Sequence, residues 1–569
     1  MATEAVTMPE SKAPTDNGPK TEDLSVTPTF MLAKPKERGD TFSSFLNHGH
    51  PLRVDATFPK DIHKQTWQQK VSMIVVKILW RIYPLLKLVG FIFEWTLNFL
   101  VLNHGPFHIL FNLLFFRWSK IVIPQSDADN YLSCVGQLDP RNELYVDTSK
   151  KGKAESTRTD ELVFPDENVG SRKTADVCVM AAKLAYENEA VVKRVVEQSW
   201  NMHFVKFFDC WNDYQHMNNT QAFIAMDKPT DANAVVLAFR GTEGFNAYDW
   251  STDFDFSWVK FPDLGSVHLG FLEALGLATR EDPSSFTKLR NRALEAKKHR
   301  RRADRMGASS GLAEHIIQNR GKSLAYDDIN TQLSTILDEN PKAKLFVTGH
   351  SLGGALASLY AIWLHYAGNT EIASRIGAVY TFGGPRIGDE DVKNYGNQVL
   401  AGKLFRVVYC NDLVPRIPFD NQIMAFKHFG ICAYFNSVYD GLTLQEEPNP
   451  NFFGVARLIT MHLNALWEVF QGLIFITLQH GHEYTETTFS ILVRAVGLLL
   501  PGVASHSPTN YVNSVRLGPF PLRERIKGDI ADISQEIYLM QDNVKDIIVA
   551  VYEEFLTVLG LKSPKRKQP

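Results

Sequence analysis

Cysteine is scarce in this chain and follows no regular spacing. The 569 residues include five cysteines, which are Cys134, Cys178, Cys210, Cys410 and Cys432. An odd number of scattered cysteines provides neither a disulfide framework nor a set of metal ligands. We therefore expect a protein of a reducing compartment that holds no structural metal.

An excess of one charge is also missing. Lys and Arg number 60 against 63 Asp and Glu, which leaves a net charge of −3. This balance predicts no nucleic-acid partner. The first residues lack a basic stretch followed by an apolar core, so we expect no secretory signal and a catalytic part that faces the cytosol.

The most informative motif is a G-x-S-x-G pentapeptide between a strand-like and a helix-like segment. Residues 345–347 are continuously apolar, as in a buried parallel strand, and residues 355–367 favour a helix. This context is typical of the nucleophile elbow of an α/β-hydrolase. Ser351 is the candidate nucleophile, and Gly349 and Gly353 leave room where strand and helix approach closely.

A carboxylate and then a histidine are expected after the serine. Asp412 lies just past a second strand-like run, residues 404–409. A carboxylate beyond the carboxyl end of a parallel strand is well placed to face the nucleophile. Asp389 is the main competitor, because it also follows a strand-like run.

The residues alone leave the base open among several histidines after Asp412. They are His428, His462, His480, His482 and His506. A turn-rich loop after an apolar stretch contains His506, which favours that residue. His462 and His480 adjoin hydrophobic runs and fit packing positions better.

The elbow sequence Gly-His-Ser-Leu-Gly-Gly and the segment Phe239–Thr242 resemble those of the class 3 (fungal-type) lipases. Across residues 230–520 the chain is similar to the plant oil body lipases, a membrane-associated branch of that class. In this family the acid lies in an Asn-Asp-x-Val-Pro segment, which Asn411–Pro415 matches. The base lies in a C-terminal loop before an aromatic residue, which His506 and Tyr511 match.

The resemblance implies a catalytic triad and an oxyanion hole. Ser351 would be the nucleophile, Asp412 the acid and His506 the base. The backbone N–H groups of Leu352 and Thr242 would bind the oxyanion. Acid and base stand 94 residues apart, which is wider than in the small secreted members. Such a triad needs no metal and no other cofactor.

The fold class implied is α/β, an α/β-hydrolase with a mostly parallel sheet, over residues 126–525. In the family, the aromatic-rich stretch at residues 243–258 carries a lid. A polar segment at residues 279–323, which includes the basic cluster 297–302, is predicted to be a surface insertion. Residues 1–60 contain few large apolar side chains and are predicted to be a disordered tail.

Residues 61–125 are predicted to associate with a membrane. Three apolar blocks, residues 71–83, 85–102 and 107–116, are separated by Pro84 and by a turn-like segment. The blocks contain the charged residues Lys77, Arg81, Lys87 and Glu94. Charged residues that form narrow stripes on these helices argue against three membrane-spanning helices. They favour helices that lie in one leaflet of a membrane. Helices packed on the catalytic domain and a bilayer-spanning anchor are the alternatives.

Two further apolar runs, residues 463–478 and 491–503, fall between the acid and the base. They account for much of the wide spacing of these two residues. Our hypothesis is that they form a cap or rim that brings the catalytic mouth to the lipid.

The C-terminal part is predicted to form a long amphipathic helix over residues 526–562. Apolar residues alternate spacings of four and three between residues 526 and 551, the pattern of a coiled-coil seam. Such a helix forms a homo-oligomer or docks on its own chain. Residues 563–569 would follow as a basic tail.

These features predict a serine ester hydrolase that acts on water-insoluble acylglycerols, namely a triacylglycerol lipase that releases fatty acids. Its partners would be the lipid substrate and the surface of a lipid droplet or membrane. It would be located on lipid droplets (oil bodies), on the endoplasmic reticulum membrane, or on both. Two rivals remain open: a phospholipase A1 or galactolipase with the same triad, and a catalytically inactive droplet-coating protein.

Overall fold

The structure, a computed structural model, describes most of the chain between residues 67 and 519. The described residues are 26–27, 67–145, 170–213, 217–242, 257–279, 284–291, 322–418, 426–444, 455–475, 486–519 and 523–524, with single residues 215, 282, 295, 448, 452 and 484. The predicted C-terminal helix, the basic tail, the basic cluster 297–302 and most of the predicted lid lie outside these residues.

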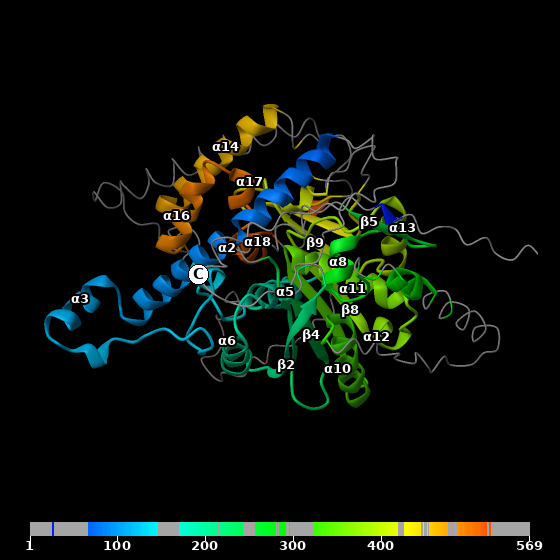
Figure 1. Cartoon of the computed structure of the whole chain (residues 1–569), viewed down its shortest axis with the longest axis horizontal. Helices are drawn as coiled ribbons and strands as arrows, with labels where there is room; N and C mark the ends of the chain where they lie inside the picture. The colour runs from blue at the N-terminus through cyan, green and yellow to red at the C-terminus, as the bar shows by residue number, and fades with distance from the viewer. Residues whose placement is uncertain are drawn as a thin grey trace, which may run out of the picture.

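A nine-stranded sheet forms the centre of the molecule (Figure 1). Its strands follow the order β12-β11-β10-β9-β8-β7-β4-β3-β2. Neighbours from β4 to β10 pair parallel, whereas β2 with β3, β3 with β4, and β10 with β11 pair antiparallel. The mostly parallel sheet expected from the sequence is confirmed.

The strands of this sheet are short and largely apolar. Their bounds are β2 His203–Asn212, β3 Met217–Met226, β4 Ala234–Phe239, β7 Lys344–His350, β8 Ile376–Phe382, β9 Leu404–Tyr409, β10 Ile431–Phe435, β11 Gly441–Leu444 and β12 Arg523–Glu524. A smaller sheet contains β1 Val26–Thr27, β5 Trp258–Phe261 and β6 Gly265–His268. Strand β1 therefore places two residues of the predicted N-terminal tail in a sheet.

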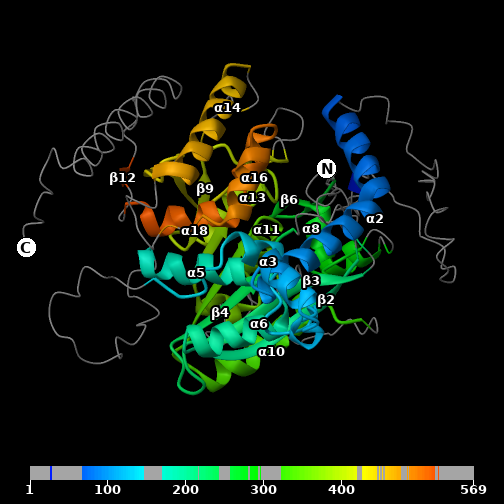
Figure 2. The ribbon, with the colours of Figure 1, turned by 90° about the vertical axis from the view of Figure 1, so that its left-hand side faces the viewer.

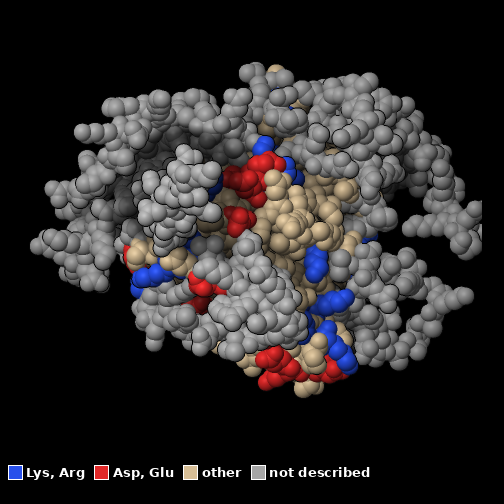
Figure 3. Space-filling model, turned by 90° about the vertical axis from the view of Figure 1, so that its right-hand side faces the viewer, with Lys and Arg blue, Asp and Glu red and all other residues tan. Residues whose placement is uncertain are grey.

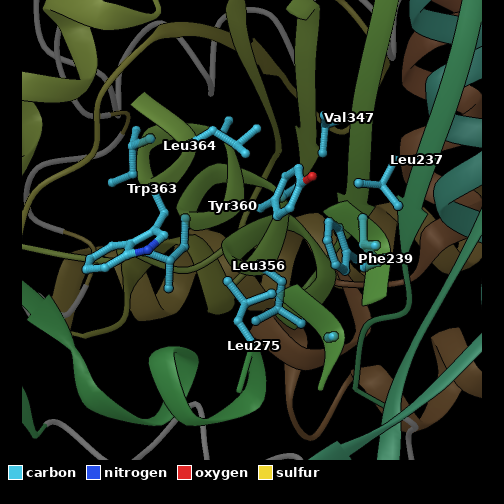
Figure 4. Close-up of a cluster of buried hydrophobic side chains, with 14 of the residues drawn as sticks. Leu237, Phe239, Leu275, Val347, Leu356, Tyr360, Trp363 and Leu364 are labelled. Atoms are coloured by element: carbon cyan, nitrogen blue, oxygen red, sulfur yellow. The ribbon is translucent and has the colours of Figure 1, made fainter. Parts of the chain in front are cut away.

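Helices cover both faces of the large sheet because its central strands are apolar on both sides. Alternate residues of β4 show this: Val235 and Leu237 belong to one buried cluster, Ala234 and Val236 to the other. The first cluster includes side chains of α8 Leu269–Ala274, α10 Ala325–Glu339 and α11 Leu352–Tyr366. In Figure 4 its members Tyr360 and Phe239 lie between α11 and the sheet.

The second face is covered by helices that are distant in the chain. Helix α5 Arg172–Leu184 and helix α18 Pro508–Leu517 contribute side chains to the second cluster. The remaining helices are α4 Cys134–Leu138, α6 Glu189–Arg194, α12 Thr370–Arg375 and α13 Glu390–Val399, with short helical turns at Trp118–Lys120, Val195–Ser199 and Val414–Arg416. The segment 284–291 is also helical and buries Phe286 and Leu289, so the predicted surface insertion begins inside the core.

The N-terminal apolar blocks differ from the expectation at one point. Residues 67–102 form a single helix, α2 Trp67–Leu102, with Pro84 inside it, so the predicted break at this proline is wrong. Proline removes only one backbone donor and kinks a helix without necessarily ending it. Within α2 the segment Arg81–Leu102 is long and apolar enough to cross a membrane. The third block forms the separate helix α3 Pro106–Leu114.

The insertion between the predicted acid and base folds as a helical cap. It contains α14 Val455–Phe470, which continues as a wider helical turn at Gln471–Phe475, then α16 Thr488–Gly497 and α17 Pro501–Ala504. Both apolar runs predicted for this region therefore fall largely on helices. Figures 1 and 2 show α14 and α16 above the sheet, on the same side as α2.

A buried ion pair joins the two helices of the second face. The guanidinium of Arg516 on α18 donates to the carboxylate of Asp176 on α5 at 2.7 Å, and both side chains are almost fully buried. Asp176 also accepts a hydrogen bond from the backbone N–H of Tyr145 at 2.7 Å. Neutralising one partner of such a pair leaves the other charge buried without compensation.

We expect Asp176→Asn to lower the free energy of unfolding by about 3–5 kcal/mol, because the Arg516 guanidinium would remain buried. Chemical denaturation followed by tryptophan fluorescence would measure the loss. The control is Lys393→Ala, which removes an exposed pair with Glu390 at 2.9 Å and should cost less than about 1 kcal/mol. Equal losses for the two variants would contradict the expectation.

Candidate active site

Ser351 stands on a sharp turn between β7 and α11. Its backbone has φ 58° and ψ −131°, a conformation that costs a non-glycine residue about 1–3 kcal/mol. The backbone N–H of Ser351 donates to the carbonyl of Phe382 on β8 at 2.9 Å. The surrounding sheet and helix therefore hold the serine in this conformation.

Two glycines permit the turn. A Cβ at Gly349 would lie 2.2 Å from the carbonyl oxygen of Gly353. A Cβ at Gly353 would lie 2.3 Å from the carbonyl oxygen of Phe239 at the end of β4. Both contacts are with backbone atoms, which cannot rotate away, so only glycine fits.

The acid and the base predicted from the sequence are in contact. Asp412 follows β9 and is fully buried, and His506 follows α17. The Nδ1 atom of His506 lies 2.7 Å from Oδ2 of Asp412. The other carboxylate oxygen accepts a hydrogen bond from the backbone N–H of Val414 at 2.8 Å, and Tyr511 donates its phenolic hydrogen to Oδ2.

The serine loop and the Asp–His pair lie at the same edge of the sheet. Gly383, at the end of β8, follows the carbonyl that binds the Ser351 N–H. A Cβ at Gly383 would lie 2.8 Å from Oδ2 of Asp412 and 3.0 Å from Cε1 of His506. Ser351 and Asp412 therefore follow the carboxyl ends of strands in one sheet, and His506 packs near the end of β8 between those strands. The Ser351 hydroxyl is buried and has no hydrogen-bond partner among the described residues.

The competing residues have other roles or lie elsewhere. Asp389 caps α13, where its carboxylate accepts from the N–H groups of Val392 at 3.1 Å and Ser266 at 2.9 Å. The Nε2 atom of His428 lies 2.8 Å from the carbonyl of Pro415. His462 is exposed on α14. His480 and His482 lie outside the described residues.

The two residues predicted to donate to the oxyanion lie in segments that adjoin the elbow. Leu352 is the first residue of α11, so its N–H belongs to the open N-terminal turn of that helix. Thr242 is buried in the loop after β4. This loop packs on the elbow, because a Cβ at Gly241 would lie 2.3 Å from the carbonyl oxygen of His350.

The elbow histidine takes part in an arrangement that the sequence did not indicate. Nδ1 of His350 lies 2.7 Å from the hydroxyl of Tyr186, and Nε2 lies 2.9 Å from the backbone carbonyl of His506. Burial, together with the nearby His506, holds the pKa of His350 well below its ordinary value. A neutral His350 with its proton on Nε2 satisfies both contacts. Tyr186 is 164 residues away from His350, and no local pattern marks it.

A buried network ties the cap to the site. Arg494 on α16 forms ion pairs with Glu468 of α14, at 3.3 Å, and with Glu486. It also donates to the side chain of Asn510 on α18 at 2.9 Å. Tyr409, which ends β9 before the acid, donates to Glu468 at 3.0 Å. The long insertion between acid and base is thus fixed to the elements that carry both.

Comparison with known proteins finds a matching family model and several relatives. The family model described as "Lipase (class 3)" matches residues 236–422. The protein named "Triacylglycerol lipase OBL1" from Nicotiana tabacum is 40% identical over 529 residues, covering 85% of this chain and 90% of that protein. Its namesake from Arabidopsis thaliana is 40% identical over 466 residues, covering 81% and 87%. Among solved structures, the Rhizomucor miehei triacylglyceride lipase matches with a TM-score of 0.31 and 21% identity, over 45% of this chain and 77% of that one.

We expect Gly353→Ala to destabilise the elbow by about 1–3 kcal/mol, because the new methyl group would overlap the backbone of β4. Hydrolysis of a soluble short-chain ester should fall with it, since the loop that carries Thr242 must move. The matched control is Gly384→Ala, whose Cβ would meet its nearest atom at 3.3 Å, and it should lose less than half as much stability. Thermal melting and ester hydrolysis measure both variants. A fully active Gly353→Ala protein would contradict the steric role of this glycine.

Proposed function

The chain belongs to the class 3 lipase family, in the branch of the plant oil body triacylglycerol lipases, and from this premise we propose that it hydrolyses the ester bonds of triacylglycerol at the surface of oil droplets. The proposal rests on the contact between Asp412 and His506. This pair lies at the same sheet edge as Ser351, whose backbone is strained and whose hydroxyl has no hydrogen-bond partner among the described residues.

The proposed acylation step assigns one role to each of the three side chains. His506 takes the proton of the Ser351 hydroxyl while the oxygen attacks the ester carbonyl carbon. The carboxylate of Asp412 holds the ring through Nδ1 and stabilises the imidazolium that forms. The backbone N–H groups of Leu352 and Thr242 donate to the oxyanion of the tetrahedral intermediate.

Collapse of the intermediate breaks the bond between the carbonyl carbon and the alcohol oxygen. His506 returns its proton to that oxygen, and diacylglycerol leaves. Water then attacks the acyl-serine with the same histidine as base, which releases the fatty acid and restores the hydroxyl of Ser351. Every proton in this cycle is carried by the histidine, so no metal or cofactor takes part.

The substrate class rests on the relatives. Proteins named triacylglycerol lipases are 40% identical to this chain over most of their own length. Polar lipids remain the alternative substrate, since a phospholipase A1 or galactolipase uses the same triad.

The proposed location is the surface of lipid droplets or of the endoplasmic reticulum membrane, with the catalytic domain on the cytosolic side. The exposed apolar helices of the chain support a lipid surface as partner. Self-association through residues 526–562 stays a prediction, because this segment lies outside the described residues.

We expect Ser351→Ala and His506→Ala to lower the hydrolysis of emulsified trioleoylglycerol by about 10⁴-fold or more, since neither variant has a complete nucleophile–base pair. Asp412→Asn should lose a comparable factor because its amide orients the imidazole wrongly. Radiolabelled fatty acid release measures all three variants. Reaction with a fluorophosphonate probe should disappear in Ser351→Ala.

The control for the histidine is His462→Ala, which removes an exposed histidine of α14 and should leave hydrolysis of a soluble ester unchanged. Faster hydrolysis of phospholipid or galactolipid vesicles than of triacylglycerol would move the substrate to polar lipids. Persistent probe labelling in Ser351→Ala would remove the serine from the mechanism. Absence of labelling in the wild type would favour an inactive droplet-coating protein.

A further inference from the structure

Within the part of the chain that the structure describes, the large exposed apolar side chains fall in two stretches. Among the described residues, every large hydrophobic side chain that is exposed lies within residues 78–123 or 459–503. On the face turned away from α3, Figure 3 shows basic and acidic side chains among other described residues. Apolar exposure is thus a local property of α2, α3 and the cap.

Helix α14 has its polar and apolar faces reversed relative to a helix of a water-soluble protein. Its exposed side chains Ile459, Leu463, Leu466 and Phe470 follow spacings of four, three and four and are between 45% and 61% exposed. Its buried side chains are largely polar, namely Arg457, Thr460, Asn464 and Glu468. Water on the apolar face would be unfavourable, whereas hydrocarbon would suit it.

The next part of the cap repeats this reversal. Leu492 and Val496 of α16 are exposed, while Arg494 between them is buried in its ion pairs. Leu499 and Leu500, just before α17, are 79% and 63% exposed. In both α14 and α16, charged side chains are thus buried and apolar side chains are exposed.

Helix α2 shows the same arrangement and is fixed to the lipase domain through its polar side. The Asn98 side chain bonds both the N–H and the carbonyl of Leu132, at 2.9 and 2.8 Å. Asn103 does the same with Val122, at 2.8 Å for each bond. Glu94 accepts from the N–H of Cys134 at 3.0 Å. Glu94 and Asn98 lie one turn apart on the same side of the helix, and Asn103 directly follows its last residue.

The opposite side of α2 is apolar and open. Leu85, Leu88 and Ile92 are 62%, 47% and 53% exposed. The cap continues this surface, because Phe93 of α2 and Phe489 of α16 have ring centroids 5.2 Å apart. Figures 1 and 2 show α2, α14 and α16 on the same side of the sheet.

This surface adjoins the catalytic residues. Helix α17 leads directly into His506, and the carbonyl of Gly502 on α17 accepts from the N–H of Leu413, next to the catalytic acid, at 3.0 Å. The apolar side chains of the cap therefore begin within a few residues of the base.

Charge also favours a lipid surface. The exposed charged residues between positions 81 and 123 are all basic: Arg81, Lys87, Arg117 and Lys120. Glu94, the acidic residue of this stretch, is partly buried and bonded to Cys134. Basic residues at the border of an apolar surface attract anionic phospholipid headgroups.

We propose that the exposed apolar sides of α2, α14 and α16 form one lipid-docking face that lies in a single phospholipid leaflet over oil, with α2 along the surface rather than across a bilayer. The inference rests on the proposed function for the nature of the oil. A crossing α2 would have to break the bonds of Glu94, Asn98 and Asn103 or carry the loops at residues 122–134 into hydrocarbon, where unpaired polar groups are costly.

The first test replaces apolar groups of the cap in the full chain. Leu463→Ser, Leu466→Ser and Phe470→Ser are combined in one variant, and flotation with triolein droplets coated with phosphatidylcholine and phosphatidylserine measures binding. We expect at least a tenfold lower droplet-bound fraction and a parallel loss of triolein hydrolysis. Labelling of Ser351 by a soluble fluorophosphonate should stay at the wild-type level, which shows that the fold is intact.

The matched control keeps the same positions apolar, as Leu463→Met, Leu466→Met and Phe470→Leu, and should bind droplets like the wild type. Full droplet binding by the serine variant would overturn the proposal. So would a wild-type protein that is a dimer in solution and becomes monomeric in the serine variant, because the face would then bind a second copy. Droplet binding by a wild type that fails to hydrolyse or label would overturn the proposed function alone.

The second test measures the orientation of α2. Fluorophores on Leu85→Cys and Thr96→Cys, each in a Cys134→Ser background, sit on the exposed side, eleven residues and so about 16 Å apart along the axis. Quenching by lipids with nitroxides at set depths should report the same shallow depth for both labels. A depth difference near 16 Å would show a spanning helix and overturn the proposed orientation.

Discussion

The close approach of β4, β7 and α11 at the elbow is the constraint on which the rest of the site depends. Gly349 and Gly353 bring backbone against backbone, and Ser351 is held in a conformation that a free chain would leave. The same packing places the N–H of Leu352 and the loop of Thr242 beside the serine. One steric feature thus positions both the proposed nucleophile and the segments of the proposed oxyanion donors.

The acid and the base depend on a second, electrostatic feature. Asp412 and His506 are 94 positions apart, and the proposed base would be positioned poorly if the residues between them formed a loose loop. Instead, Arg494 is buried among Glu468, Glu486 and Asn510, and Glu468 is bonded to Tyr409 at the end of β9. Burial raises the pKa of Glu468, and the ion pair with Arg494 opposes this rise.

This interior network also explains the exterior of the cap. A helix that must turn Arg457, Asn464 and Glu468 toward the protein has only its other side left for Leu463 and Phe470. The polar interior fixes the cap to the catalytic loops, and the apolar exterior suits it to lipid. The amphipathic pattern of α14, with polar side chains inward and apolar side chains outward, thus both attaches the cap and exposes an apolar surface.

Sequence alone determined those features that are local. The elbow, the strand ends that carry Ser351 and Asp412, and the mostly parallel sheet follow from short patterns, since strand periodicity and glycine sterics act between near neighbours. The family resemblance selected His506, which the residues alone left among five histidines. The break expected at Pro84 is wrong, because proline can kink a helix without ending it. The contacts of Tyr186 with His350 and those of the Arg494 network could not be predicted from the sequence. Neither could the side of α2 and α14 that faces outward. A hydrophobic pattern indicates that a helix has an apolar side and a polar side, but only packing against distant residues decides which of the two is buried.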